Sequence, residues 1–221
     1  KSTTHLNGDN TIEQFSYSYT NSILNYNKNI IAELIKKTTS KNGKNIYERK
    51  IEYLTNGSHY NPVSLKETTL SGEDLAMITY DLYDEKGNLL QYTKKSGIPV
   101  TIIWGYNKTQ PIAKIEGSNY ASINTNTLLI NAIMASDTDA SQAINNNEEP
   151  LLTILDNLRK DPSMSEYMIT TYTYDPLIGV RSITPPSGIR EYYYYDLSGK
   201  LQSIKDVDGN ILKEYLYNYK N

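Results

Sequence analysis

The stretch that decides the fold reads Tyr195-Asp196-Leu197-Ser198-Gly199-Lys200-Leu201. Aspartate at the first turn position can accept hydrogen bonds from the backbone amides that follow, and glycine at the fourth supplies a positive φ at no steric cost. The same frame returns as Tyr83-Asp84-Glu85-Lys86-Gly87 and, one residue longer, as Tyr174-Asp175-Pro176-Leu177-Ile178-Gly179. Asp206-Val207-Asp208-Gly209 repeats the turn alone. A motif that recurs in this way predicts a repeated supersecondary unit.

The spacing of the tyrosines predicts what that unit is. Tyr83 and Tyr106, Tyr174 and Tyr195, and Tyr195 and Tyr217 each lie roughly 22 residues apart, which leaves room for two short strands and two tight turns. Tyrosines that alternate with other residues occupy one face of a strand. We therefore expect a mainly β fold, an antiparallel sheet of stacked β-hairpins that twists or spirals.

One segment lacks the hairpin pattern and predicts helices. Residues 127–134 carry apolar side chains at helical spacing, and Asn147 can cap a second helix that has Pro150 in its first turn. An apolar stripe from Leu151 to Leu158 follows, and Asp161-Pro162 ends it. The predicted organisation is β-hairpin repeats over 1–118, degenerate at the N-terminal end, a helical insertion over 119–168, and further repeats over 169–221. We expect these parts to form one continuous structural unit.

The composition excludes several classes of protein. The chain has 221 residues, 21 of them tyrosine, and a net charge of −3 with scattered lysines. Without a basic stripe, nucleic-acid binding is not expected. No apolar run is long enough to span a membrane. The absence of cysteine removes disulfides, thiolate metal sites and cysteine nucleophiles.

No catalytic or metal-binding residue is predicted. The two histidines, His5 and His59, lie in polar, turn-like surroundings and form no triad or zinc pattern. Asp206 and Asp208 are similar to part of a calcium loop, but the glycine comes too early, so the turn explains these aspartates better. No acidic pair stands out for glycosidase chemistry. We expect no cofactor, no metal and no enzyme activity, with a glycan-acting enzyme as the distant alternative.

The aromatic side chains outside the repeat frame offer one candidate binding surface. Trp104 ends an apolar strand with Tyr106 two residues on, and Tyr192 and Tyr194 lie on the second face of a tyrosine-rich strand. If exposed, these rings could stack on sugar rings. The competing interpretation is that they cover the hydrophobic seam between adjacent hairpins.

The frame from Tyr195 to Leu201, shared by residues 83–89, resembles the YD-repeat, or rearrangement-hot-spot (Rhs), family of bacterial surface and secreted proteins. Residues 172–180, followed by Pro186-Ser187-Gly188, look like the variant of Bacteroidetes-type members. The resemblance implies hairpins stacked into a long sheet. It also implies a secreted or cell-surface location, and we expect the chain to be the C-terminal part of such a protein, without a toxin domain and without its signal peptide.

Together these features predict a non-catalytic repeat module that acts as a scaffold or in adhesion. The alternative is a carbohydrate-binding module that uses the exposed tryptophan and tyrosine surface. The expected partners are a cell-surface glycan, other repeat segments of the same protein, or a second copy that pairs along an open sheet edge.

Overall fold

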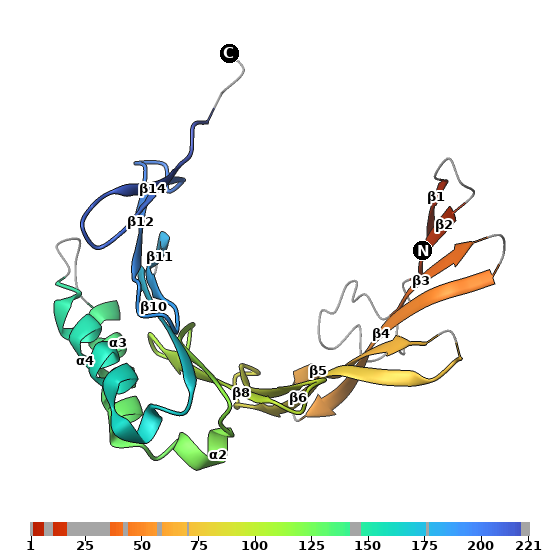
Figure 1. Cartoon of the computed structure of the whole chain (residues 1–221), viewed down its shortest axis with the longest axis horizontal. Helices are drawn as coiled ribbons and strands as arrows, with labels where there is room; N and C mark the ends of the chain where they lie inside the picture. Colours follow the sequence, from red (N-terminus) through yellow and green to blue (C-terminus); the bar gives the residue numbers. More distant parts are fainter. Residues whose placement is uncertain are drawn as a thin grey trace. The chain divides into compact units, whose positions relative to one another are not determined.

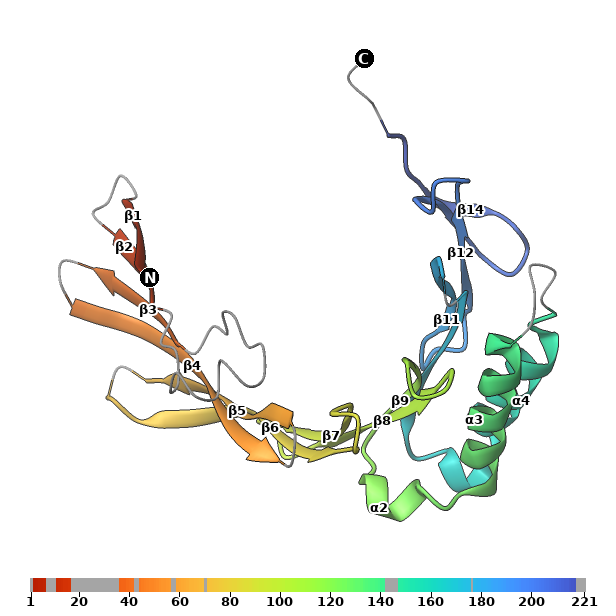
Figure 2. The same cartoon turned by 180° about the vertical axis from the view of Figure 1, so that it is seen from behind.

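The computed structural model describes residues 2–6, 11–16, 36–41, 44–56, 59–69, 71–141, 147–175 and 177–217. The chain divides into two compact units, Lys1–Ile98 and Pro99–Asn221. Much of the segment predicted to hold degenerate N-terminal repeats lies outside the described residues. Figures 1 and 2 show the chain from two opposite sides.

The first unit is an antiparallel meander in which each strand pairs with the next one along the chain. Its strands are β1 (Ser2–Leu6), β2 (Thr11–Ser16), β3 (Lys36–Lys41), β4 (Lys44–Asn56), β5 (His59–Thr68), β6 (Asp74–Tyr83) and β7 (Leu89–Lys94). Strands β3 to β6 form a single layer (Figure 1). Among the side chains described in this unit, none that is apolar is fully buried. The strands are therefore held by backbone ladders and polar side-chain pairs.

The second unit combines a meander with helices. Its strands are β8 (Pro99–Gly105), β9 (Gln110–Glu116), β10 (Met168–Asp175), β11 (Gly179–Thr184), β12 (Glu191–Tyr195), β13 (Leu201–Lys205) and β14 (Ile211–Glu214). Neighbours along the chain again pair antiparallel. Between β9 and β10 come α2 (Tyr120–Ile123), α3 (Thr127–Ala140), α4 (Glu149–Lys160) and the 3₁₀ turn η1 (Pro162–Met164).

Local signals in the sequence explain where the helices begin and end. The side chain of Asn126 accepts from Leu128 N and caps α3. At the start of α4, Asn147 Oδ1 accepts from Glu149 N at 3.2 Å, and proline stands in the first turn. At its end, the carboxylate of Asp161 accepts from Ser163 N at 2.8 Å and so caps η1.

The hydrophobic core lies between these helices and the sheet. Figures 1 and 2 show α3 and α4 side by side along the strands of the second unit. The buried cluster consists of Ile103, Tyr106, Ile112, Ala113, Ile115, Ile123, Leu129, Ala132, Leu151, Leu155, Leu158, Met164, Ile169 and Tyr174. Burial of these side chains supplies the main driving force for folding this unit. The prediction of a mainly β fold of antiparallel hairpins with a short helical insertion is confirmed.

Candidate functional site

The recurring aspartates bind the backbone of their own turns. Asp196 Oδ1 accepts from Ser198 N at 2.8 Å and from Lys200 N at 2.9 Å, and Gly199 has a φ of 73°. Asp84 and Asp206 make the same pair of bonds, to the amides of residues 86 and 88 and of residues 208 and 210. Asp175 accepts from Leu177 N at 3.2 Å in the longer turn. These carboxylates are therefore engaged in turn geometry.

The recurring tyrosines make a second regular bond. Each donates its hydroxyl to a backbone carbonyl of the preceding strand: Tyr83 to Pro62 at 2.7 Å, Tyr174 to Pro111 at 2.9 Å, Tyr195 to Val180 at 2.9 Å, and Tyr217 to Leu201 at 2.8 Å. Burial raises the pKa of Tyr83 to about 12. Burial raises the pKa of Tyr174 and of Tyr195 as well, so the hydroxyls of these three tyrosines stay protonated, as their hydrogen bonds require.

A β-bulge follows directly after every one of these accepting residues, because the next residue of the accepting strand is skipped by the register. Register shifts lie between Glu52 and Tyr53, Ile103 and Trp104, Thr173 and Tyr174, and Tyr194 and Tyr195. The residue after each shift pairs with Pro62, Pro111, Val180 or Leu201, respectively. A bulge disrupts the ladder locally and leaves backbone groups in need of partners. The tyrosine hydroxyl supplies such a partner by donating to the carbonyl beside the bulge. The repeat tyrosine and the bulge therefore occur together as one structural unit.

Tyr106 does not belong to an exposed aromatic surface. The side chain is only 1% exposed and packs edge-on against Tyr174, with ring centroids 5.5 Å apart. It lies in the core because the turn after β8 folds under α3, whose residues bind it. Its ring is therefore not accessible to a ligand.

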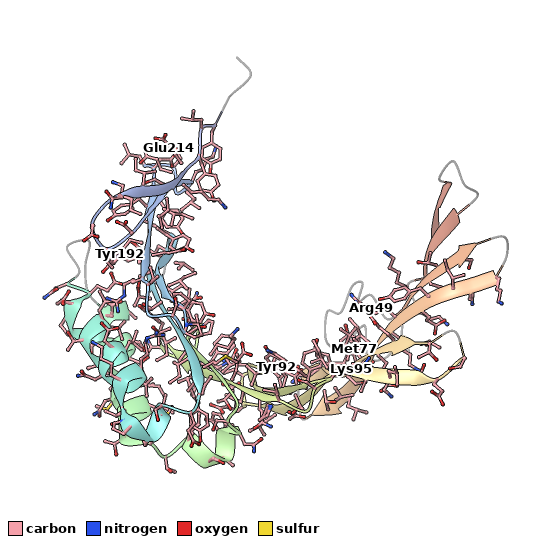
Figure 3. All side chains as sticks on the ribbon, viewed as in Figure 1. Arg49, Met77, Tyr92, Lys95, Tyr192 and Glu214 are labelled. Atoms are coloured by element: carbon pink, nitrogen blue, oxygen red, sulfur yellow. The ribbon has the colours of Figure 1, made fainter. Side chains whose placement is uncertain are left out.

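The remaining aromatic candidates do not share a face. Trp104 is half-buried and follows Ile103, a core residue, so by strand alternation it points away from the helices. Tyr192 pairs with Ser182, which pairs with Thr173 on the helix side of the sheet. Tyr192, labelled on β12 in Figure 3, therefore points to that side. Tyr194 lies two residues on along the same strand and points to the same side. Tyr194 is 46% exposed, and Lys205 Nζ lies 4.7 Å from the centre of its ring.

A polar relay joins the helical insertion to the sheet. Tyr106 donates its hydroxyl to Asp139 Oδ2 at 2.8 Å and accepts from Tyr174 N at 2.9 Å. Burial raises the pKa of Tyr106, so the phenol stays protonated. This relay connects the turn after β8, helix α3 and strand β10.

The turn after β8 is strained, and α3 holds it in place. Three successive residues, Tyr106, Asn107 and Lys108, have φ between 51° and 61°. This conformation costs roughly 1–2 kcal/mol per residue. Ser136 Oγ accepts from Tyr106 N at 3.2 Å, and Asp137 Oδ1 accepts from Asn107 N at 2.6 Å. Charge-assisted bonds such as that of Asp137 offset part of the strain.

Glu148 is a buried carboxylate at the start of α4. The residue is 7% exposed, and its Oε2 lies 3.3 Å from Arg181 Nε. Its Oε1 has no hydrogen-bond partner among the described residues. Burial raises the pKa of Glu148, while a hydrogen bond from Thr173 and the charge of Arg181 act in the opposite direction. The nearby charge of Asp139 raises it further.

Two arginines bind the end of α4 to the sheet. Arg159 donates to three carbonyl oxygens: Nη1 to Ile169 at 2.5 Å and Thr184 at 2.9 Å, and Nη2 to Pro185 at 2.6 Å. Arg190 donates to Asp156 Oδ1 at 2.5 Å and to Thr184 Oγ1 at 2.9 Å. Both guanidinium groups therefore lie near one carboxylate, that of Asp156.

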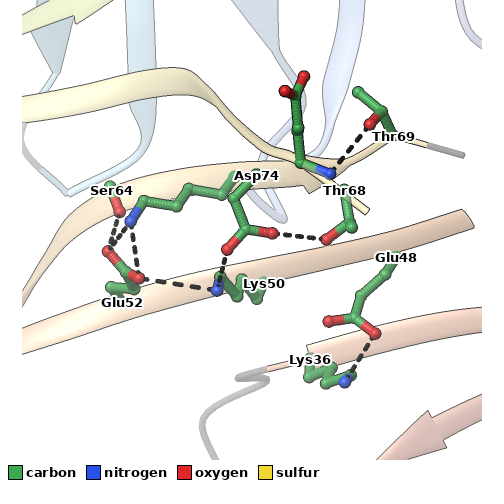
Figure 4. A network of polar contacts seen from close by, with 10 residues as sticks. Lys36, Glu48, Lys50, Glu52, Ser64, Thr68, Thr69 and Asp74 are labelled. Atoms are coloured by element: carbon green, nitrogen blue, oxygen red, sulfur yellow. Dashed lines mark hydrogen bonds and ion pairs between the residues drawn. The ribbon is translucent and has the colours of Figure 1, made fainter. Parts of the chain in front are cut away.

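In the first unit, oppositely charged side chains pair across the strands (Figure 4). Lys36 bonds Glu48 at 2.6 Å, Lys66 bonds Glu52 at 2.7 Å, and Lys50 forms an ion pair with Asp74. The bond from Lys66 holds the pKa of Glu52 below its usual range, and that from Lys50 does the same for Asp74. These pairs follow β4, with glutamates and a lysine alternating along one of its faces.

The opposite face of β4 is mixed in character. Arg49 bonds Glu67 at 2.6 Å, and Tyr47 donates to the same carboxylate at 2.6 Å. Tyr53 stacks on Tyr60, with ring centroids 5.2 Å apart. Figure 3 shows Arg49 and the neighbouring side chains of this unit. Both faces of the sheet thus carry polar groups that are paired within the unit.

The described residues contain no group of three or more His, Asp or Glu side chains placed to hold a metal ion. No helix among them is long and apolar enough to cross a bilayer. The side chains of His5 and His59 lie outside the described part of the structure.

Sequence reasoning missed the buried polar groups of the insertion. Asp139, Glu148 and Arg159 act across elements that are distant in the sequence, and no motif marks them. Their one local signal is a charged residue inside or beside an apolar helical stripe, which is also the usual pattern of a solvated helix face.

No protein-family model and no curated protein matches the chain. Among solved structures it is similar to TcdB2-TccC3 without its hypervariable C-terminal region, at 13% identity and a TM-score of 0.38. It is also similar to the Photorhabdus luminescens Tc holotoxin pore, at 13% identity and a TM-score of 0.36. Both matches cover 96% of this chain and 12% of the other. The chain therefore spans a small part of the proteins it matches.

Proposed function

We propose that the chain is a non-catalytic scaffold of β-hairpin repeats. The observation that carries this proposal is the hydroxyl-to-carbonyl bond that recurs at Tyr83, Tyr174, Tyr195 and Tyr217. Each bond joins a hairpin to its predecessor, and each lies at a bulge of the same kind. The motif residues with ionisable side chains are engaged in turns and in these bonds.

Two further observations support a structural role. The buried acid Asp139 and the arginines Arg159 and Arg190 bind one element to another. The aromatic side chains suggested for sugar binding point to different faces or into the core. No described feature therefore favours the carbohydrate-binding alternative over the scaffold.

Duplication of one repeat, from the turn after β10 to the end of β12, tests the scaffold directly. The variant carries a second copy of residues 175–195, inserted after Tyr195. Each copy then begins with Asp175 directly after a tyrosine, as it does in the natural chain. Repeat arrays gain stability from nearest-neighbour contacts, so the longer chain is expected to fold with more β structure and an unchanged or higher melting temperature. Circular dichroism and thermal unfolding measure both.

The control insertion has the same composition in scrambled order and is expected to lower the melting temperature. If the duplicated chain unfolds or aggregates as readily as the scrambled one, residues 175–195 are not a modular repeat and the proposal fails. A saturable signal on a glycan array that Trp104→Ala or Tyr194→Ala abolishes would replace the scaffold by a carbohydrate-binding module.

A secreted or cell-surface location is part of this proposal and rests on the sequence resemblance alone. Fractionation of the source cells, with an antibody against the chain, tests it. Recovery in the culture medium or on the surface is expected, and recovery only in the cytosol would overturn this part of the proposal.

A further inference from the structure

A cavity of about 280 Å³ lies where the end of α4 meets the sheet of the second unit. It is lined by Asp156, Arg159, Lys160, Gly188, Arg190 and Val207. The residues come from α4, the loop between β11 and β12, and the turn after β13. A cavity of this size can hold a small oxyanion together with part of the molecule that carries it.

The lining carries an excess of positive charge. Three cationic side chains, Arg159, Lys160 and Arg190, face one carboxylate, that of Asp156, which leaves two positive charges uncompensated. Asp206 precedes Val207 but turns its carboxylate onto the amides of its own turn. Basic residues at a helix C-terminus also complement the helix dipole, which is the simplest account of Lys160. That account does not explain Arg190, which comes from a different element.

Hydrogen bonds hold both guanidinium groups in place, and each group keeps N–H donors that could bind a ligand. Arg159 uses both hydrogens of Nη1 and one of Nη2 on carbonyls, and within the described part of the chain its Nε and its second Nη2 hydrogen make no hydrogen bond. Arg190 donates through Nε and Nη2, and its Nη1 makes no hydrogen bond to the described residues. Its side chain is only 12% exposed. Partly buried, oriented and incompletely paired guanidinium groups are typical of sites that recognise carboxylate or phosphate.

The two arginines also repel each other. Burial lowers the pKa of Arg159, the charge of Asp156 acts against this, and the charge of Arg190 lowers it further. A bound anion would relieve this repulsion, since an opposite charge within a few ångströms favours the charged form of each group. The positive charge of the cavity is thus not balanced by the carboxylate of Asp156 alone.

We propose that this cavity binds a tetrahedral, doubly charged oxyanion, a phosphate or sulfate group, through Arg159, Arg190 and Lys160. The charge of the ligand matches the two uncompensated positive charges of the lining. The inference is independent of the scaffold role.

Thermal unfolding of the full chain in inorganic phosphate, in sulfate and in glucuronate tests the proposal, with sodium chloride at matched ionic strength as reference. A ligand that binds only the folded chain raises its melting temperature in a saturable way. Phosphate and sulfate also stabilise proteins by exclusion from the surface, which acts on all variants alike. The decisive readout is therefore the difference between variants.

Val207→Glu places a carboxylate at the rim of the cavity, where it competes with the ligand, and Lys160→Gln removes one cation. Leu197→Glu is the matched control, since Leu197 holds the equivalent position of the preceding turn and does not line the cavity. The expected result is a saturable shift in the unmodified chain and in Leu197→Glu, roughly tenfold weaker affinity in Lys160→Gln, and no saturable shift in Val207→Glu.

Equal responses of all four proteins to phosphate and sulfate would show surface exclusion alone and overturn the proposal. A saturable shift with glucuronate but not with phosphate or sulfate would overturn the choice of a tetrahedral ligand. A substitution can also change the melting temperature of the ligand-free chain, which complicates the comparison of thermal shifts. In that case isothermal titration calorimetry with phosphate measures the affinity of each variant directly.

Discussion

At the residue scale, the tyrosine hydroxyl is the smallest part of the repeat that can be removed alone. Tyr195→Phe deletes the bond to Val180 O and leaves the ring in place. The expected loss in the free energy of unfolding is about 1 kcal/mol, the usual net value of one hydrogen bond plus a carbonyl left unpaired. Urea unfolding measures it. Tyr194→Phe is the control, because its ring is exposed, and it is expected to change stability by much less.

If the two variants lose the same amount, the hydroxyl bond of Tyr195 is exchanged for water at no cost, and the recurring bond does not stabilise the array.

Glu148 gives a prediction about pH. Because burial raises its pKa above the ordinary value of 4.5, the folded chain holds the proton more tightly than the unfolded chain. The contribution of this carboxyl to stability is therefore fully present below pH 4.5 and is lost as the pH rises through the folded-state pKa. Glu148→Gln keeps the shape without the charge. The free energy of unfolding of the variant, relative to that of the natural chain, is expected to rise across this window.

Denaturant titrations at several pH values measure the effect. Glu149→Gln, which removes an exposed carboxyl one residue on, is the control for a general change in charge. A difference between Glu148→Gln and the natural chain that stays constant from about pH 4 to pH 8 would contradict the prediction.

At the element scale, the contact between the turn after β8 and helix α3 depends on one glycine. A Cβ on Gly105 would lie 2.0 Å from Ser136 Oγ and 2.9 Å from Ser136 Cβ, so the helix would have to move. Gly105→Ala is expected to lower stability by roughly 1–3 kcal/mol or more, as overpacking of a core does.

Gly199→Ala is the comparison within the same unit. Gly199 has a positive φ, but nothing lies within 4 Å of the position that a Cβ would take, so the cost there is backbone strain of about 1 kcal/mol. Thermal unfolding ranks the two variants. Should Gly199→Ala be the more damaging, the turn and α3 are not packed as tightly as the distances indicate.

The sequence predicts elements better than it predicts their contacts. The turn residues, such as Asp196 and Gly199, act within a few positions of each other, so the motif itself contains their chemistry. The helices are likewise predicted by Asn147, the apolar stripe and Asp161. Tyr106 is different: it matches the spacing of the repeat tyrosines, yet its hydroxyl binds Asp139, because the helical insertion supplies a partner that no local pattern encodes.

The cavity beside α4 was beyond sequence reasoning for the same reason. Arg159, Arg190 and Val207 stand far apart in the chain and meet only when α4 packs on the sheet. A single arginine in a helix or at the start of a strand carries no signal of its own.

At the scale of the whole molecule, the two units rest on different forces. The second has a hydrophobic core, whereas the described side chains of the first depend on ion pairs such as Lys66–Glu52 and Arg49–Glu67. Exposed pairs contribute little each and are screened by salt, with a Debye length of about 3 Å at 1 M. We expect amide hydrogens of residues 44–68 to exchange faster at about 1 M sodium chloride, and those of residues 111–174 to change little.

Hydrogen exchange of the intact chain, followed by mass spectrometry at low and high salt, measures both regions at once. Equal sensitivity of the two regions would mean that the ion pairs across β4 do not hold the first sheet together.

The tyrosine-to-carbonyl bonds also give the array a direction. In each of the four cases a tyrosine of a later hairpin donates its hydroxyl to a carbonyl of an earlier hairpin. Each bond therefore satisfies a backbone group of the hairpin on its N-terminal side. Excision of one hairpin would therefore weaken its predecessor and leave its successor's donor without its usual acceptor. Because of this one-way dependence, the array is best lengthened by whole units that contain both a donor tyrosine and an accepting carbonyl. Recombination that separates the tyrosine from the carbonyl within a unit is expected to lower stability.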